Sequence, residues 1–210
     1  KLSVIGGMSF SGYGKEDLAV MACLASREEG KDLIDLAVTE YVKTIGADLG
    51  QYKQVSFTPF DPLTKKSEAI IEKNGYRFRV VKGSPQIIIS MCKGIDERTR
   101  MEADKAIEEM SQKGYRTLAV ARSRDNDLSD LLLVGMLSLA DPLRLDSRAT
   151  IEEAKGLGLK PIMLTGDNIN IAKEIARQAS IGNRIIRMAD LEGLGEEEKA
   201  KIIEETDGFA

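Results

Sequence analysis

The distribution of apolar and polar positions divides the chain into segments with helical spacing and segments with strand spacing. Residues 15–27 and 31–45 both show apolar residues at helical intervals, and Gly46 closes the second segment. From residue 52 the period changes to that of strands, in runs at residues 52–57, 67–73 and 76–83. The Asn74–Gly75 pair between the last two runs predicts a tight β-hairpin.

The same pattern continues with two helices and two strands. Ser84 and Pro85 suit the start of a helix that ends at Gly94, and a second helix at about residues 98–113 ends at Gly114. Strands are predicted at residues 115–122 and 131–140. The pattern over residues 10–125 therefore predicts an α+β unit of helices and an antiparallel sheet. Residues 1–9 are expected to form either a first strand or a linker.

Residues 131–168 predict a piece of parallel α/β structure. The nearly continuous apolar strand 131–140 stops at Asp141-Pro142, and it is followed by a helix at 148–155, a short strand at 161–164 and a helix at 169–180. Thr165-Gly166-Asp167 thus follows the carboxyl end of a strand, where open α/β sheets bind ligands. This group suits a phosphate and Mg²⁺ corner, although taken alone it also suits an ordinary turn.

A strand at 184–188, an acidic helix at 196–205 and the start of a further strand complete the pattern, which indicates a fragment of a larger protein.

The amino-acid composition narrows the range of possible functions. The balance of 30 Lys+Arg against 34 Asp+Glu gives no argument for nucleic-acid binding, and without an apolar run of about 18 residues the chain is expected to be soluble. Because the chain has no histidine, His-based catalysis and His metal sites are excluded. The two cysteines are expected to be core thiols.

Several scattered residues form a candidate nucleotide site. Lys82 and Gly83 end an apolar strand before a helix, so that a base or phosphate could approach the backbone beside an ammonium group. Phe60 lies in a polar, proline-rich turn where it could stack on adenine, and Lys66 and Arg116 supply further cations. The alternative interpretation of Lys82 is a solvated lysine in a strand-to-helix turn. Ordinary surface charge is the alternative interpretation of Lys66, Arg116 and the helical carboxylate Asp35.

The segments DPLR (141–144) and LTGDN (164–168) resemble the DPPR and TGDxxxxA motifs of P-type ATPases, with Leu143 in place of the second proline. The resemblance covers essentially the whole chain and is closest to plasma-membrane proton pumps. KGSP (82–85) resembles the family's KGAP motif. By the same resemblance, Phe60 is the aromatic residue that stacks on adenine. Lys66 is the basic residue that follows it, with Lys65 as a competitor for that role. Arg116 and Leu118 line the pocket, Asp35 reaches the adenine amine, and Asp141, Pro142 and Arg144 form a hinge.

The resemblance implies an ATP-binding domain at 10–125, preceded by a linker at 1–9 and followed by part of a haloacid-dehalogenase-like phosphorylation domain at 126–210. It also implies Mg²⁺ as a cofactor, transmembrane and actuator domains as partners, and a place on the cytoplasmic face of a membrane protein. The DKTGT aspartate, which becomes phosphorylated in this family, and the GDGxND motif do not occur in the sequence. We therefore expect ATP binding without turnover. The alternatives are a free-standing haloacid-dehalogenase-type phosphatase and a non-enzymatic interaction module.

Overall fold

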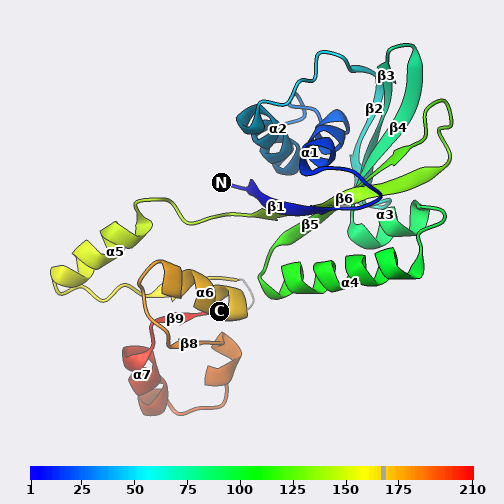
Figure 1. Cartoon of the computed structure of the whole chain (residues 1–210). Helices are drawn as coiled ribbons and strands as arrows, with labels where there is room; N and C mark the ends of the chain where they lie inside the picture. Colours follow the sequence, from blue (N-terminus) through cyan, green and yellow to red (C-terminus); the bar gives the residue numbers. More distant parts are fainter. Residues whose placement is uncertain (167–168) are drawn as a thin grey trace. The chain divides into compact units, whose positions relative to one another are not determined.

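The computed structural model describes residues 1–166 and 169–210 (Figure 1). The contacts within it define two compact units. Unit 1 consists of Lys1–Ser111 and Tyr115–Asp141, and unit 2 of Gln112–Gly114 and Pro142–Ala210. Within the described residues, none of the helices combines the length and the apolar character needed to cross a membrane.

Unit 1 is built on a six-stranded sheet with the strand order β1-β6-β5-β4-β3-β2. All neighbouring strands are antiparallel. The strands are β1 (Ser3–Ser9), β2 (Lys53–Asp61), β3 (Lys66–Lys73), β4 (Tyr76–Gly83), β5 (Arg116–Ser123) and β6 (Leu131–Ala140). The hairpin between β3 and β4 turns at Asn74 and Gly75, both with positive φ (50° and 82°), which confirms the predicted turn.

Helices cover both faces of this sheet (Figure 1). They are α1 (Lys15–Leu24), α2 (Leu33–Ile45), α3 (Pro85–Met91) and α4 (Glu97–Gln112). Val80 of β4 belongs to the core under α1 and α2, whereas the next residue, Val81, belongs to the core under α3 and α4. Apolar side chains therefore lie on both faces, which explains why a central strand such as β6 reads as a nearly continuous apolar run.

Local signals fix the ends of α2. The side chain of Asp32 accepts hydrogen bonds from the backbone N–H groups of Ile34 (2.9 Å) and Asp35 (3.0 Å), which caps the N-terminus. Gly46 follows the last turn in the left-handed conformation, with φ of 69°. Together these caps place Asp35 in the first turn of the helix.

Unit 2 contains a three-stranded parallel sheet with the order β7-β9-β8. Its elements are α5 (Ser147–Gly156), β7 (Met163–Leu164), α6 (Ile169–Gln178), β8 (Ile185–Ile186), the 3-10 helix η1 (Met188–Leu191), α7 (Glu196–Glu205) and β9 (Gly208–Phe209). Ala172 and Ala176 on the apolar stripe of α6 pack with Ile185 of β8, as the helical periodicity predicted.

The structure confirms a mixed α/β fold but differs from the predicted boundary between the two parts. Residues 131–140 form β6, which pairs antiparallel with β1 and β5 and does not belong to the parallel sheet. Residues 3–9 are a strand of the same sheet, so they are not a linker. The compact units divide after Asp141 and not after residue 125. An apolar run without alternation suits a central antiparallel strand covered by helices as well as a parallel one, and the sequence pattern did not separate these cases.

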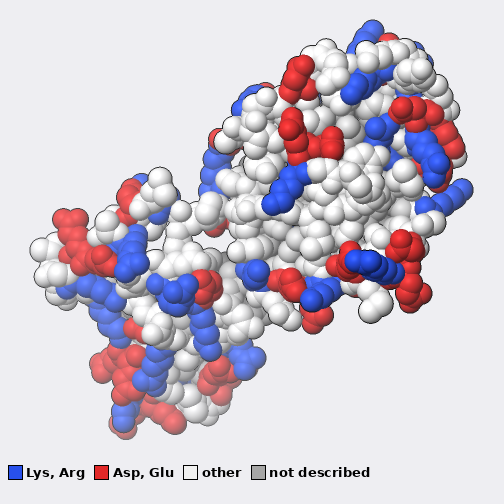
Figure 2. Space-filling model, in the orientation of Figure 1, with Lys and Arg blue, Asp and Glu red and all other residues white. Residues whose placement is uncertain are grey.

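Charged side chains of both signs are interspersed on the visible surface (Figure 2). Most ion pairs of the described residues are exposed, such as Arg98–Glu102 and Arg148–Glu152 at helical spacing. Such pairs contribute little to stability. A buried ion pair in unit 1, between Lys82 and Asp35, is the exception that matters for the site.

Candidate functional site

The register of β2, β3 and β4 brings four of the predicted residues to one end of neighbouring strands. Asp61 of β2 pairs with Lys66 of β3, and Lys66 pairs with Gly83 of β4. Phe60 precedes Asp61, and Lys82 precedes Gly83. Since neighbouring strands are about 5 Å apart, Phe60, Lys66, Lys82 and Gly83 lie within a small part of unit 1.

Phe60 presents an unusual aromatic surface at this position. Half of it (50%) is exposed, and within the described residues its ring has no aromatic or cation partner. Phe57, earlier on the same strand, instead packs against the core under α1 and α2. The ring of Phe60 is therefore the one of the two that a flat ligand can reach.

Lys66 is partly neutralised by a neighbour. Its Nζ lies 2.8 Å from Oε2 of Glu68, which also pairs with Arg79. Partial burial would raise the pKa of Glu68, but hydrogen bonds from Arg79 and Lys66 outweigh this effect and lower the pKa below its ordinary value. Lys65, the competing basic residue, is exposed and has no ion pair within the parts of the chain that the structure describes.

Lys82 does not extend into solvent. Its side chain is 3% exposed and forms an ion pair with Asp35 of α2, whose side chain is 10% exposed. The other oxygen of Asp35, Oδ2, accepts the backbone N–H of Arg27 at 2.9 Å. Both carboxylate oxygens thus have partners inside the protein, so Asp35 and Lys82 form one buried polar unit at the edge of the candidate site.

Gly83 is required by the fold at this point. A Cβ added to it would lie 2.3 Å from the carbonyl oxygen of Lys65 and 2.8 Å from Cα of Lys66. The backbone of the turn after β2 therefore occupies the space that a side chain would need. The sequence pattern suggested that a ligand approaches the backbone at this glycine, and the structure adds this internal reason for it.

The two predicted residues of β5 are in different environments. Leu118 is buried in the core under α1 and α2. Arg116 is exposed at the start of the strand, where it pairs with Leu139 of β6, three residues beyond the last β4–β5 pair at Ala119. Alternation places Arg116 on the same face as Leu118 and Lys82, since Lys82 pairs with Val120, but roughly 13 Å farther along the strand.

The sequence pattern did not indicate a role for Arg27, whose backbone N–H donates to Asp35. The guanidinium of Arg27 lies over the ring of Phe57, with Cζ 4.9 Å from the ring centroid. Its Nε donates to Oε1 of Gln54 at 2.8 Å. An arginine in the loop after a helix carries no local signal of such a role, and the β2 residues it contacts are distant in sequence.

The predicted phosphate corner and hinge lie in or next to unit 2. Thr165 and Gly166 follow β7, and the backbone N–H of Thr165 donates to the carbonyl of Phe209 at 3.1 Å. Asp167 is outside the described residues. Asp141, Pro142 and Arg144 are exposed, and Arg144 pairs with Asp146 at 2.7 Å. Within residues 1–166 and 169–210 no group of three or more acidic or cysteine residues is arranged to hold a metal ion.

A cavity of about 240 Å³ lies between α3 and α4, on the other face of the sheet. It is lined by Gln86, Ile89, Ser90, Arg100, Asp104 and Ile107. None of the residues singled out from the sequence lines it. The candidate site is therefore the end of β2, β3 and β4 on the α1/α2 side, not this cavity.

A family model and the relatives of this chain all point to the same protein family. The family model described as P-type ATPase, cytoplasmic domain N, matches residues 22–146. A protein of Methanocaldococcus jannaschii named as a cation-transporting ATPase is 38% identical over 97% of this chain. Plasma membrane ATPases of Zygosaccharomyces rouxii and Kluyveromyces lactis are each 37% identical over 100% of it. The chain spans about a quarter of the length of these relatives (26%, 24% and 25%). The chain therefore belongs to the P-type ATPase family, and its residues 22–146 match the cytoplasmic domain N of that family.

Proposed function

We propose that unit 1 binds ATP at the end of β2, β3 and β4. The observation that carries this proposal is the cross-strand row Asp61–Lys66–Gly83, which places the exposed ring of Phe60 beside basic residues. An aromatic face stacks on any purine, and ammonium and guanidinium groups bind phosphate oxygens. Phe60 would hold the base, while Lys66 or Lys65 and Arg116 would attract the phosphates.

Asp35, Lys82, Gly83 and Leu118 would complete the pocket. The buried Asp35–Lys82 pair fixes the position of α2 against β4, and Leu118 supplies apolar surface beneath the site. In the resemblance, Asp35 reaches the adenine amine. Because both oxygens of Asp35 already have partners, such a contact would use one of the remaining lone pairs of the carboxylate.

In the whole protein, the bound ATP would phosphorylate an aspartate and drive cation transport at the cytoplasmic face of a membrane, with Mg²⁺ neutralising the phosphates. The plasma membrane ATPases among the relatives favour protons as the cation. Thr165, Gly166 and Asp167 would contribute to the phosphate and Mg²⁺ corner. Because DKTGT is absent from these 210 residues, we propose that they bind the nucleotide without hydrolysing it.

Titration of ATP followed by amide NMR and calorimetry tests the binding site. We expect shifts clustered at Phe60, Lys82 and Arg116, and Phe60→Ala should weaken binding by about 1–3 kcal/mol, the usual cost of a lost base stack. Tyr76→Ala is the matched control, because Tyr76 is a similarly exposed aromatic (54%) at the opposite end of β4. An equal loss in both variants would contradict a specific stack at Phe60.

Two other outcomes separate the alternatives. Flat NMR spectra up to millimolar ATP would favour an interaction module. Hydrolysis of p-nitrophenyl phosphate with Mg²⁺, abolished by Asp125→Asn or Asp141→Asn, would favour a phosphatase. The structure places Asp125 in the loop between β5 and β6, paired with Arg122 and followed by Asn126 with positive φ (61°). A phosphatase of this class needs its nucleophilic aspartate directly after a buried strand, and Asp125 in this exposed hairpin loop does not suit that role.

A further inference from the structure

A β-bulge decides which face of the sheet carries Phe60. Between Thr58 and Asp61, β2 contains one residue more than the facing segment of β3. In a regular strand Phe57 and Phe60 would lie on opposite faces, because side chains alternate, but the extra residue brings both to the same face. Phe57 packs against the core under α1 and α2, so Phe60 lies on that face as well.

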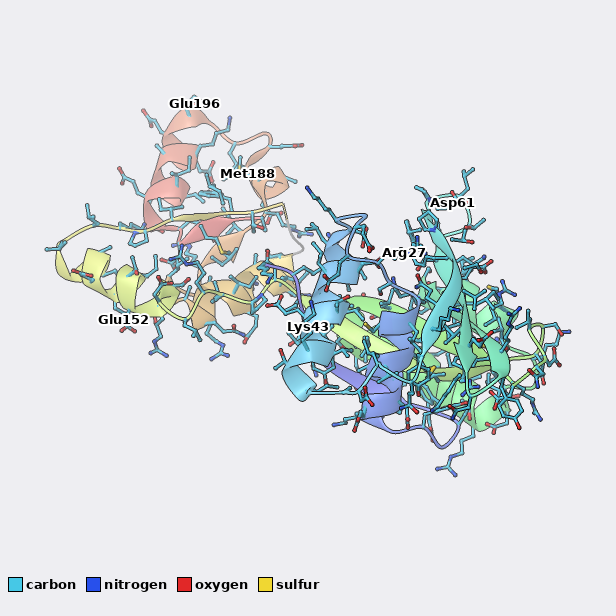
Figure 3. The ribbon with its side chains drawn as sticks, turned by 90° about the horizontal axis from the view of Figure 1, so that it is seen from above. Arg27, Lys43, Asp61, Glu152, Met188 and Glu196 are labelled. Atoms are coloured by element: carbon cyan, nitrogen blue, oxygen red, sulfur yellow. The ribbon has the colours of Figure 1, made fainter. Side chains whose placement is uncertain are left out.

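Arg27 and Arg116 lie on opposite sides of Phe60 along the strand direction. The guanidinium of Arg27 lies over Phe57, which comes about 10 Å before Phe60 on β2. Arg116 lies beyond the end of β4, in the direction in which β2 runs toward Phe60. Figure 3 shows Arg27 beside β2 and Asp61 at the end of the same strand. A nucleotide that stacks on Phe60 and extends its phosphates toward Arg116 therefore turns the opposite edge of its base toward Arg27.

Arg27 is held in place from three directions. Its backbone N–H donates to the buried carboxylate of Asp35 (2.9 Å), its Nε donates to Gln54 (2.8 Å), and its guanidinium lies over Phe57. Gln54 is itself fixed, because its Nε2 donates to the carbonyl of Leu24 at 3.0 Å. The guanidinium is therefore oriented before any ligand arrives, which lowers the entropic cost of binding.

The outer edge of this guanidinium has unused donors. Within the parts of the chain that the structure describes, Arg27 makes no ion pair, and its Nη1 and Nη2 have no hydrogen-bond partner. Asp35, which contacts the backbone of the same residue, offers only acceptors when it is ionised. The two residues thus present a donor and an acceptor to one region of the site. An adenine edge has the complementary pattern, because the amine is a donor and the ring nitrogen beside it is an acceptor.

We propose that Arg27 reads the adenine base by donating from Nη to one of the two ring nitrogens that flank the amine, N1 or N7. This inference rests on the proposed function and deepens it, since it adds a residue that recognises the base at the end of the site away from the phosphates. Asp35 accepts from the amine, Arg27 donates to the neighbouring ring nitrogen, and Phe60 carries the face of the base.

The test is a titration of the 210-residue chain, followed by amide NMR, with ATP, adenosine, 1-deaza-ATP and 7-deaza-ATP. Arg27→Met keeps the stem on Phe57 but has no donor. It should weaken the binding of ATP and adenosine by the same factor, about tenfold, because a charged hydrogen bond to the base is lost. One of the two deaza analogues lacks the recognised nitrogen. That analogue should bind the unsubstituted chain about tenfold more weakly than ATP, and Arg27→Met should add no further loss.

Arg100→Met is the matched control, since Arg100 is an exposed arginine of α4 on the other face of the sheet. It should leave the binding of all four ligands unchanged. If Arg27→Met does not fold, Arg27→Lys provides the same comparison, because its ammonium keeps the charge but lacks the planar fork.

Three results would overturn the inference while leaving the proposed function intact. They are unchanged ATP affinity in Arg27→Met, a larger loss for ATP than for adenosine, which would assign Arg27 to the phosphates, and an undiminished loss with both deaza analogues, which would assign it to the packing of Phe57. Absence of ATP binding by the unsubstituted chain would instead overturn the proposed function itself.

Discussion

At the scale of single residues, Lys82 and Asp35 face each other from β4 and α2, 47 positions apart in the sequence. Both side chains are almost fully removed from water, and each has lost its hydration. A buried pair of this kind contributes little net stability compared with apolar residues, but removing one partner leaves an uncompensated charge in the interior. The pair therefore fixes where α2 meets the sheet.

A double-mutant cycle on this pair should give a large coupling energy. We expect Lys82→Met to lower the free energy of unfolding by about 3–5 kcal/mol, because Asp35 is left buried and charged. Lys82→Met combined with Asp35→Leu should lose much less than the sum of the single changes. Urea denaturation measures all three variants, and additive losses would contradict the strong coupling of the pair.

The control for this cycle is an exposed pair in the same sheet. Arg77 Nε lies 3.0 Å from Glu72 Oε2, with side chains 58% and 33% exposed. Solvent screening limits such a pair to about 0–1 kcal/mol. Arg77→Met and Glu72→Gln should therefore change stability little, which separates the effect of burial from that of charge alone.

At the scale of elements, the sheet of unit 1 separates two cores, and each contains one cysteine. Cys23 lies under α1 and α2, and Cys92 under α3 and α4. Burial raises the pKa of both thiols, and it raises the pKa of Cys92 to about 11. Both should react slowly with alkylating reagents while the protein is folded, since the thiolate is the reactive form.

The raised pKa of Cys92 predicts a loss of stability in alkali. The folded pKa of about 11 lies above the ordinary value of 9.0, so folding favours the protonated thiol. This stabilisation is fully present below pH 9 and is lost as the pH rises through about 11, by about 2–3 kcal/mol. The measurement is the free energy of unfolding from pH 8 to 11. Cys92→Ala should show a smaller decline over this range, and equal slopes would contradict the prediction.

Local sequence signals predicted the elements but not all of their pairings. The Asn74–Gly75 turn and the glycine after α2 are determined by backbone conformation at single positions, and both were predicted correctly. The pairing of β1 with β6 joins residues about 130 positions apart, such as Ser3 and Ala140, and no local period reports it. The burial of Lys82 depends in the same way on a distant partner, so a lysine at a strand end looked like a solvent-facing cation.

At the scale of the whole molecule, the candidate site belongs to unit 1 and the predicted phosphate corner to unit 2. Resemblance to the family identified both sets of residues in the sequence, and the structure gives the first set a shared position through strand register. It could not do so for the second, because Asp167 lies outside the described residues. The nucleotide proposal therefore depends on the residues of unit 1, whose contacts the structure describes.

The segment between the two units should be an early site of proteolysis. Residues 142–146 form no helix or strand, Leu145 is fully exposed (105%), and Arg144 pairs with the exposed Asp146. A protease needs locally extended, accessible backbone, which this segment offers without unfolding a core. Limited trypsin digestion followed by mass spectrometry should give fragments 1–144 and 145–210, and Arg144→Gln should slow this cut.

ATP should protect a second trypsin site but not this one. Lys65 lies in the exposed turn after β2, whose backbone packs against Gly83 beside the candidate site. If the base stacks on Phe60, bound nucleotide covers this turn, and binding also lowers the population of locally open states. Cleavage after Lys65 should therefore slow as ATP is added, while cleavage after Arg144 continues at its original rate. Equal protection at both sites would indicate a general stabilisation of the protein and not a nucleotide at Phe60, and Phe60→Ala should abolish the selective effect.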